Sequence, residues 1–356
     1  MTKVQVFSNG SVYSPADPFA TSLVANGEKV EWVGSDAGAE SIMDDSMESQ
    51  DLNGLLITPG FVVGGVTVDS LQELQNLEEQ LPAHGYVAGT IFIGEDLLKE
   101  ASKISGLSLY PYVRIQRESK VEHLKNLGAY GVLVDAGQTE ASVLVSKAVD
   151  AGLKVAFDAS SEDLIESALA IVEALNAESP LKRLRAGVRL DGVLEVTQAQ
   201  LNRIEKLNIS IGFVDDLNTT SASLASAIKA GVATYIGSST QPTQKLWGWE
   251  LTTLAVHRQN SSDNISARAA FNSQTRGAWR GLGFAEPTQG QLVPGGNADF
   301  ALWYFDSLMV QTADERVAAW STDPRARTPL LPTLDGDTYP QCATTYRSSA
   351  PIFVRK

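Results

Sequence analysis

Residues 57–68 read Ile-Thr-Pro-Gly-Phe-Val-Val-Gly-Gly-Val-Thr-Val, and the character of the chain changes at this stretch. Upstream, short alternating runs such as residues 29–34 are separated by Asn-Gly turns, which is typical of a small β unit. Downstream, apolar runs with strand character alternate with amphipathic helical segments. The stretch therefore marks the passage from a β unit to an alternating β/α region.

The alternating region contains eight apolar runs that we predict to be strands. They are residues 61–68, 87–94, 107–115, 130–136, 154–159, 185–192, 209–215 and 232–238. Eight strand–helix units in sequence predict an α/β fold of the (β/α)8 TIM-barrel type. The alternative is a doubly wound open sheet, but residues 63–66 (Val-Gly-Gly-Val) lack the Gly-rich phosphate loop typical of its first turn.

Both ends of the chain carry turn and strand patterns. Residues 263–283 are predicted to form one further helix with its cap, and strand patterns return from residue 290 onward. We therefore expect the two termini to share one small β-sandwich-like domain with the barrel inserted between them. The expected boundaries are residues 1–56 plus 286–356 for the composite β domain and 57–285 for the barrel.

The composition narrows the possible partners. The chain has 356 residues, 43% of them hydrophobic, and a net charge of −14 from 42 acidic and 28 basic side chains. Phosphates would be repelled, so we expect no nucleic-acid partner and no membrane partner. Cys342 is the single cysteine, which excludes an intrachain disulfide. With no signal-peptide or transmembrane pattern in the sequence, we expect a cytoplasmic protein.

Three stretches of the sequence resemble the amidohydrolase superfamily. The first is residues 55–62 (Leu-Leu-Ile-Thr-Pro-Gly-Phe-Val), the second is residues 264–283, and the third is residues 290–300 (Gly-Gln-Leu-Val-Pro-Gly-Gly-Asn-Ala-Asp-Phe). The resemblance implies a barrel that hydrolyses carbon–nitrogen bonds with one or two divalent metals. It also implies that the metal ligands come from strands 1, 4, 5, 6 and 8, at the C-terminal mouth.

The positions that the resemblance assigns to metal ligands lack the expected side chains. Strand 1 has Gly65 and Thr67 instead of two histidines, and strand 4 (residues 131–137) has no lysine. The remaining degenerate positions are Asp158 on strand 5, Leu190 or a neighbour on strand 6, and Ser239 on strand 8. Neither a glycine nor a lone threonine hydroxyl can replace two imidazoles on zinc.

The three histidines do not compensate for this loss. His84 precedes the second strand, His123 lies in a helical pattern, and His257 lies near the helix after the eighth strand. None is at the C-terminal end of a strand, where barrel active sites form. We therefore expect no zinc and no other cofactor, unless a carboxylate cluster binds Mg²⁺ or Ca²⁺.

Carboxylates do follow several predicted strands. They are Asp69, Glu95, Asp135, Asp158, Asp191, Asp215 and Asp216. Asp135, Asp158 and Asp191 are the candidate catalytic residues, because converging carboxylates can bind Mg²⁺ or Ca²⁺ and one with a raised pKa can act as a general base. The alternative is that each of them caps a helix or turns the chain.

Other polar and aromatic residues are candidates for ligand binding. Arg114 and Arg189 could bind a substrate carboxylate, or they could point outward or pair with Asp191. Ser238 and Ser239 have no histidine to activate them, which favours binding, turn or cap roles over nucleophilic ones. Trp247, after strand 8, could line a pocket or pack in the core.

Two classes of function remain open. In the first, the chain is an amidohydrolase-like pseudoenzyme without zinc-dependent catalysis that binds a small molecule, serves as a scaffold or completes a homo-oligomer. In the second, it is an active hydrolase of carbon–nitrogen bonds other than peptide bonds, working through a carboxylate-rich barrel mouth. Because a fold does not fix a function, the site has to decide between them.

Overall fold

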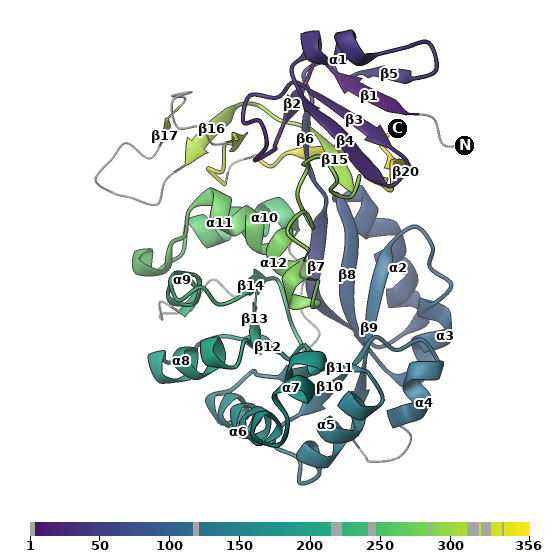
Figure 1. Cartoon of the computed structure of the whole chain (residues 1–356). Coiled ribbons are helices and arrows are strands. Elements are labelled where there is room, and N and C mark those ends of the chain that lie inside the picture. The colour runs from purple at the N-terminus through teal and green to yellow at the C-terminus, as the bar shows by residue number, and fades with distance from the viewer. Residues whose placement is uncertain are drawn as a thin grey trace.

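The structure is a computed structural model with eight parallel strands in one sheet, arranged in chain order (Figure 1). The strands are β7 (Phe61–Val68), β8 (Tyr86–Ile93), β9 (Ser108–Ile115), β10 (Gly131–Asp135), β11 (Lys154–Asp158), β12 (Arg189–Val193), β13 (Ser210–Phe213) and β14 (Thr234–Ile236). The residues described are 4–116, 121–214, 223–240, 247–284, 286–311, 320–321, 329–336 and 338–356. The predicted (β/α)8 barrel is confirmed.

The two edge strands of this sheet, β7 and β14, meet near the mouth of the barrel. Gly65 forms a parallel bridge with Ser238, and the Ser239 N–H donates to the Gly65 carbonyl at 3.1 Å. A Cβ on Gly64 would lie 2.9 Å from the Tyr235 ring and 3.0 Å from the Ile236 carbonyl. The Gly-Gly pair therefore lets the first strand approach the eighth closely enough to close the barrel.

Helices surround the barrel on its outer side (Figure 1). They are α2 (Leu71–Ala83), α3 (Leu98–Ala101), α4 (Val121–Asn126), α5 (Ala141–Asp150), α6 (Glu162–Glu178), α7 (Pro180–Ala186), α8 (Gln198–Lys206) and α9 (Ser223–Lys229), with a 3-10 turn at η1 (Glu95–Leu97). Ser161 caps α6, whose buried stripe of Ile165, Ala168 and Val172 joins the core between helices and strands. No helix among the described residues has the length and apolarity needed to span a bilayer.

The run predicted as a strand at residues 185–192 begins too early. Helix α7 extends to Ala186, with Pro180 in its first turn and Gly187 as a left-handed cap at φ 51°. Proline suits the first turn and a left-handed glycine terminates a helix, so strand β12 begins only at Arg189.

The single helix predicted at residues 263–283 is wrong as well. The chain instead forms η2 (Ser261–Asp263), α11 (Ala267–Ser273) and α12 (Arg276–Gly281), after α10 (Gly248–Val256). The break lies at Gln274, whose side chain donates to the Gly248 carbonyl and to Thr252, and whose carbonyl accepts the Val62 N–H at 2.8 Å. These contacts turn the backbone toward β7, and α12 packs against β7, β13 and β14.

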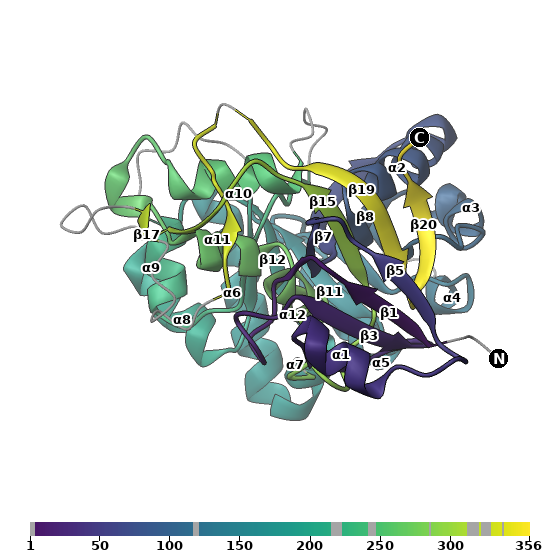
Figure 2. The same cartoon turned by 90° about the horizontal axis from the view of Figure 1, so that it is seen from above.

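The two chain ends build a pair of sheets next to the barrel (Figure 2). One contains β4 (Lys29–Gly34), β3 (Ser22–Asn26), β1 (Gln5–Ser8) and β5 (Glu48–Asp51); the other contains β2 (Ser11–Val12), β6 (Leu56–Pro59), β15 (Phe300–Tyr304), β19 (Gln341–Arg347) and β20 (Ala350–Val354). The Phe7 ring lies 5.1 Å from Phe300 and 5.3 Å from Tyr346, across the space between them. The sandwich-like unit formed by both termini is confirmed.

Smaller elements complete the chain, namely helix α1 (Asp36–Ile42) and a three-stranded sheet of β16 (Leu308–Gln311), β17 (Trp320–Ser321) and β18 (Leu331–Pro332). Strand β6 pairs with β15 as far as Pro59, so this sheet continues a few residues beyond residue 56. The division of the chain at residues 56 and 286 stays a prediction.

Candidate functional site

The interior of the barrel is built by side chains that alternate along each strand. On β12, Leu190 belongs to the apolar cluster that also contains helix residues, whereas Arg189 reaches across the barrel to other strands. Asp191, two positions further, faces the same way as Arg189. The inward residue near the strand-6 ligand position is therefore Asp191, and Leu190 points toward the helices.

A buried ion pair fills the middle of the barrel. Arg189 and Asp191 both have a relative exposure of 0%, and the Arg189 Nε and Nη2 atoms donate to the Asp191 carboxylate at 2.7 and 2.5 Å. Arg189 also donates to the Thr90 hydroxyl at 2.9 Å and to the Gly64 carbonyl. Of the roles that the sequence left open for Arg189, the structure therefore shows the pairing with Asp191.

Hydroxyl groups complete the shell of the carboxylate. The Tyr235 hydroxyl donates to Asp191 at 2.9 Å, and the Ser238 hydroxyl donates to the same oxygen at 2.5 Å. Both partners have a relative exposure of 0%. The Asp191 carboxylate is thus surrounded by hydrogen-bond donors, which compensate for its removal from water.

Aromatic rings enclose the guanidinium. The Cζ atom of Arg189 lies 4.7 Å from the ring centre of Tyr235, 5.3 Å from Tyr112 and 5.9 Å from Phe92. Burial is the largest single influence and would lower the pKa of Arg189, but the Asp191 carboxylate, its hydrogen bonds and the Tyr235 side chain together raise that pKa, so the side chain stays protonated. Burial raises the pKa of Tyr235 well above its usual value, so its hydroxyl remains a donor.

The position of the first missing histidine has no room for any side chain. A Cβ on Gly65 would lie 2.6 Å from a ring carbon of Phe92 and 2.6 Å from the Ser238 hydroxyl. Thr67, at the second position, is 9% exposed, and its hydroxyl makes a long 3.5 Å contact with the Ser239 carbonyl. A divalent metal therefore does not fit these residues, because no donor replaces Gly65 and the Arg189 charge lies at Gly64.

The three candidate catalytic aspartates lie side by side. Asp135, Asp158 and Asp191 are paired in register on the neighbouring strands β10, β11 and β12. Asp135 is exposed and accepts the Gly137 N–H at 2.8 Å, as an Asp that turns the chain does. Asp158 accepts the Thr240 hydroxyl at 3.0 Å and the Ser160 N–H at 3.1 Å.

The carboxylates are therefore neighbours whose oxygens are directed to different partners. Within the described part of the chain, no group of three or more His, Cys, Asp or Glu side chains is arranged to hold a metal ion. Of the other acidic residues singled out by the sequence, Asp69 forms an ion pair with Arg114, while Asp215 and Asp216 lie outside the described residues.

The candidate binding residues are dispersed over the barrel. Arg114, on β9, pairs with Asp69 at the mouth, and Ser238 and Ser239 belong to the closure of the barrel. Trp247 lies elsewhere: its ring stacks on His84 with centroids 3.6 Å apart and an interplanar angle of 9°. Since His84 precedes β8, Trp247 lies near the N-terminal end of that strand.

The other two histidines are also far from a metal-binding arrangement. His123 is exposed on α4, and His257 caps α10, where its Nε2 atom lies 2.7 Å from the Leu334 carbonyl. All three histidines therefore occupy helices or helix ends, in agreement with the sequence reading of their positions.

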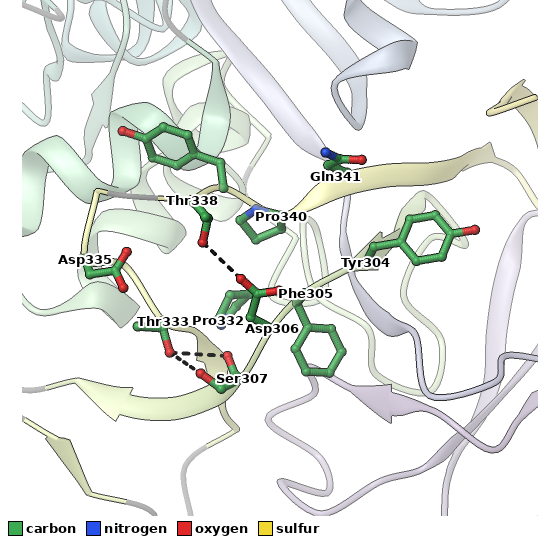
Figure 3. Close-up of a pocket in the computed structure, with 11 residues that line it drawn as sticks. Tyr304, Phe305, Asp306, Ser307, Pro332, Thr333, Asp335, Thr338, Pro340 and Gln341 are labelled. Atoms are coloured by element: carbon green, nitrogen blue, oxygen red, sulfur yellow. Dashed lines mark hydrogen bonds between the residues drawn. The ribbon is translucent and has the colours of Figure 1, made fainter.

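Among the cavities that the described residues form, two lie beside strands β15 and β19. The first, of about 280 Å³, is lined by Asp306, Ser307, Thr333 and Thr338 among others (Figure 3). Its polar groups satisfy one another, because Thr338 donates to Asp306 at 3.1 Å and the Ser307 and Thr333 hydroxyls lie 2.6 Å apart. The second cavity, of about 380 Å³, has Trp247 in its wall.

The interior network contains residues that sequence reasoning missed. Thr90, Phe92, Tyr112 and Tyr235 were treated as ordinary strand residues, yet they enclose the Arg189–Asp191 pair. Alternation was an available signal for Thr90 and Phe92, which are two positions apart on β8. It does not relate Tyr235 to Ser238, which are three positions apart with Gly237, at φ 74°, between them. Which strands face one another across the barrel could not be derived from that signal.

The architecture defines a class of protein: a (β/α)8 barrel with a composite β domain. The chain belongs to the Amidohydrolase family, whose model matches residues 71–325. No curated protein sequence matches the chain.

Solved structures with the same fold include several hydrolases. Guanine deaminase of E. coli has 16% sequence identity and a TM-score of 0.69, with 100% of both chains covered. N-isopropylammelide isopropylaminohydrolase of Burkholderia multivorans has 14% identity, a TM-score of 0.66 and 98% coverage of both chains. Atrazine chlorohydrolase of Arthrobacter aurescens, solved in complex with zinc, has 14% identity, a TM-score of 0.62 and coverage of 98% and 94%.

Proposed function

We propose that this chain is an amidohydrolase-family barrel that has lost metal-dependent hydrolysis and serves as a ligand-binding or scaffold protein. The observation that carries the proposal is the Arg189–Asp191 pair, buried in the barrel next to the Gly65 position. Arg189 holds the Asp191 carboxylate, so that carboxylate is not available to a divalent cation, and the Phe92 and Ser238 contacts leave no space for a ligand side chain at residue 65. A cytoplasmic location and the absence of nucleic-acid and membrane partners belong to the same proposal.

The interior as built favours a structural role for the ion pair. Asp191 accepts hydrogen bonds from Arg189, Tyr235 and Ser238, so its oxygens are occupied by internal donors. A general base needs access to the proton that it abstracts. Asp191, at 0% exposure, has none.

Metal analysis combined with activity measurement tests the proposal. The purified chain is dialysed against Zn²⁺, Mn²⁺ or Mg²⁺, its metal content is determined by elemental analysis, and hydrolysis of guanine and of s-triazine amines is followed with and without chelator. We expect less than about one tenth of an equivalent of metal and no turnover. Stoichiometric metal together with chelator-sensitive hydrolysis would overturn the proposal.

A second candidate function is a carbon–nitrogen hydrolase that works through carboxylates at the mouth. The register of Asp135, Asp158 and Asp191 on adjacent strands supports it. Asp158 is half-buried and accepts a hydrogen bond from the Thr240 hydroxyl. Of the three aspartates it is therefore the one best placed to act as a general base. Metal-free turnover that disappears in Asp158→Asn but persists in Asp135→Asn would favour this candidate.

A further inference from the structure

The larger cavity, of about 380 Å³, lies beside the start of α10, and we call it the α10 cavity. The end of α2, the first turn of α10, strand β15, and the segment from Tyr339 to Cys342 with Arg355 contribute its walls. These elements come from both the barrel and the composite sheet. Its volume falls at the small end of the range of about 300–1,000 Å³ that is usual for small-molecule sites.

Flat aromatic rings held in fixed positions form one side of the α10 cavity. Trp247 is stacked on His84, and Trp249, only 3% exposed, stacks on Phe271 at 5.4 Å and 22°. Tyr339 lies in the wall with 37% of its surface exposed. Rigid rings offer a large contact area at a low entropic cost, so this wall suits a planar apolar group.

Opposite charges line the same cavity. Glu250 accepts the Trp247 N–H at 2.8 Å, and the Arg355 Nε atom donates to the Cys342 carbonyl at 2.6 Å. Within the described part of the chain, neither side chain takes part in an ion pair. A cavity with one unpaired carboxylate and one unpaired guanidinium is complementary to a ligand that carries both charges.

We propose that the α10 cavity binds a small aromatic zwitterion, in the chemical class of the aromatic amino acids. The ring packs against Trp247 and Tyr339, the ammonium group pairs with Glu250, and the carboxylate pairs with Arg355. This site is separate from the barrel interior and does not depend on the fate of the metal positions. The α10 cavity would thus give a ligand site to a family member whose barrel centre is occupied by the Arg189–Asp191 pair.

Calorimetric titration of the full chain with three probes tests the proposal. L-phenylalanine carries both charges, 2-phenylethylamine carries only the ammonium group, and 3-phenylpropionate carries only the carboxylate. We expect L-phenylalanine to bind at least about tenfold more tightly than either of the others, because each lost ion pair costs affinity. No saturable heat with L-phenylalanine, or equal affinity for all three probes, would overturn the proposal.

Charge-removing variants assign each end of the ligand. Glu250→Gln should weaken L-phenylalanine and 2-phenylethylamine about fivefold or more and leave 3-phenylpropionate unchanged, because glutamine keeps the capping interaction of α10. Arg355→Gln should weaken L-phenylalanine and 3-phenylpropionate only. If Arg355→Gln does not fold, the Glu250→Gln variant alone tests the proposal. An unchanged affinity of Glu250→Gln for L-phenylalanine would contradict it.

Two matched controls separate the site from general charge effects. Glu73→Gln makes the same change in the first turn of α2, where Glu73 accepts the Asp69 N–H at 2.7 Å. Arg347→Gln makes the same change in β19, where Arg347 donates to the Ser105 carbonyl at 2.7 Å. Both variants should leave the affinity for L-phenylalanine unchanged. If either control variant lost affinity, the effect of the site variants would be due to overall charge.

Discussion

At the scale of single residues, a few small side chains determine what the barrel can contain. Gly65 and Gly212 make room for Phe92, Tyr235 and Ser238, since a Cβ on Gly212 would lie 2.3 Å from the Tyr235 ring. The large rings in turn surround the Arg189 guanidinium. The glycines at positions 65 and 212 and the filled interior are thus parts of one packing arrangement.

Gly65→Ala should destabilise the protein by about 1–3 kcal/mol, because the added methyl group collides with Phe92 and Ser238. Chemical denaturation measures the free energy of unfolding. The matched control is Gly106→Ala, where a Cβ meets nothing within 4 Å, and it should change stability by less than about 0.5 kcal/mol. Equal effects of the two substitutions would contradict the packing argument.

Asp191→Asn should cost about 3–5 kcal/mol, because it leaves the buried Arg189 charge without its counterion. The double variant Arg189→Met with Asp191→Leu removes both charges and should recover most of that loss. Urea denaturation of the two proteins provides the comparison. A double variant that is less stable than Asp191→Asn would show that the pair is not the source of the effect.

Residue identities alone predicted part of this site. The absence of metal ligands at Gly65 and Thr67 stays a prediction, whereas the pairing of Arg189 with Asp191, one of the options that the sequence left open, is present in the structure. The sequence could not show that Tyr235 and Ser238 would donate to Asp191, because those contacts depend on the closure of β14 onto β7. That closure is a long-range property of the fold.

At the scale of elements, the strand count followed from hydrophobic runs, while several boundaries did not. Strand β12 begins after α7 because Pro180 and Gly187 delimit a short helix that ends inside the run predicted as a strand. The segment 263–283 does not form one helix, because the Gln274 side chain donates a hydrogen bond to the Gly248 carbonyl on α10. Local propensity cannot anticipate a break that is set by a tertiary contact.

Gln274→Ala should lower the free energy of unfolding by about 1–3 kcal/mol, because it removes two buried hydrogen bonds to α10 and leaves a cavity in their place. Its side chain is 1% exposed. The control Gln72→Ala, on the exposed face of α2, should have an effect below about 0.5 kcal/mol in the same denaturation assay. If Gln274→Ala left the free energy of unfolding unchanged, the hydrogen bonds of Gln274 to α10 would not be what ends α11.

The junction of β15 with the β19–β20 turn makes stability depend on pH. Burial raises the pKa of Asp299 above 3.8, against the lowering effect of the Ser348 N–H bond. The folded state therefore binds the Asp299 proton more tightly than the unfolded chain does. The resulting contribution to the free energy of unfolding is fully present below pH 3.8 and is lost as the pH rises through the pKa of the folded state.

Asp299→Asn removes that titration while keeping an acceptor oxygen for Ser348. Its stability relative to the unchanged protein should rise as the pH increases from about 3 to 7, in unfolding curves measured across that range. A stability difference that does not vary with pH, or that varies in the opposite direction, would contradict the raised pKa.

At the scale of the whole molecule, the fold is that of the family, and we propose that the chemistry differs. The composite sheets, the barrel and the helices follow the family plan, and the chain superposes on hydrolases over nearly its full length. The centre of the barrel holds an ion pair enclosed by aromatic rings instead of a metal-ligand set. A shared scaffold can carry different roles, and the role that we propose for this chain is binding.

The central claim is that Arg189 and Asp191 occupy the barrel where the family holds its metal. A crystal structure of the protein grown with excess zinc, with anomalous data collected at the zinc edge, tests it most directly. Our account predicts the Arg189 guanidinium between Asp191 and the Gly64 carbonyl, with no anomalous peak inside the barrel. A zinc ion coordinated there by side chains of the barrel strands would contradict it.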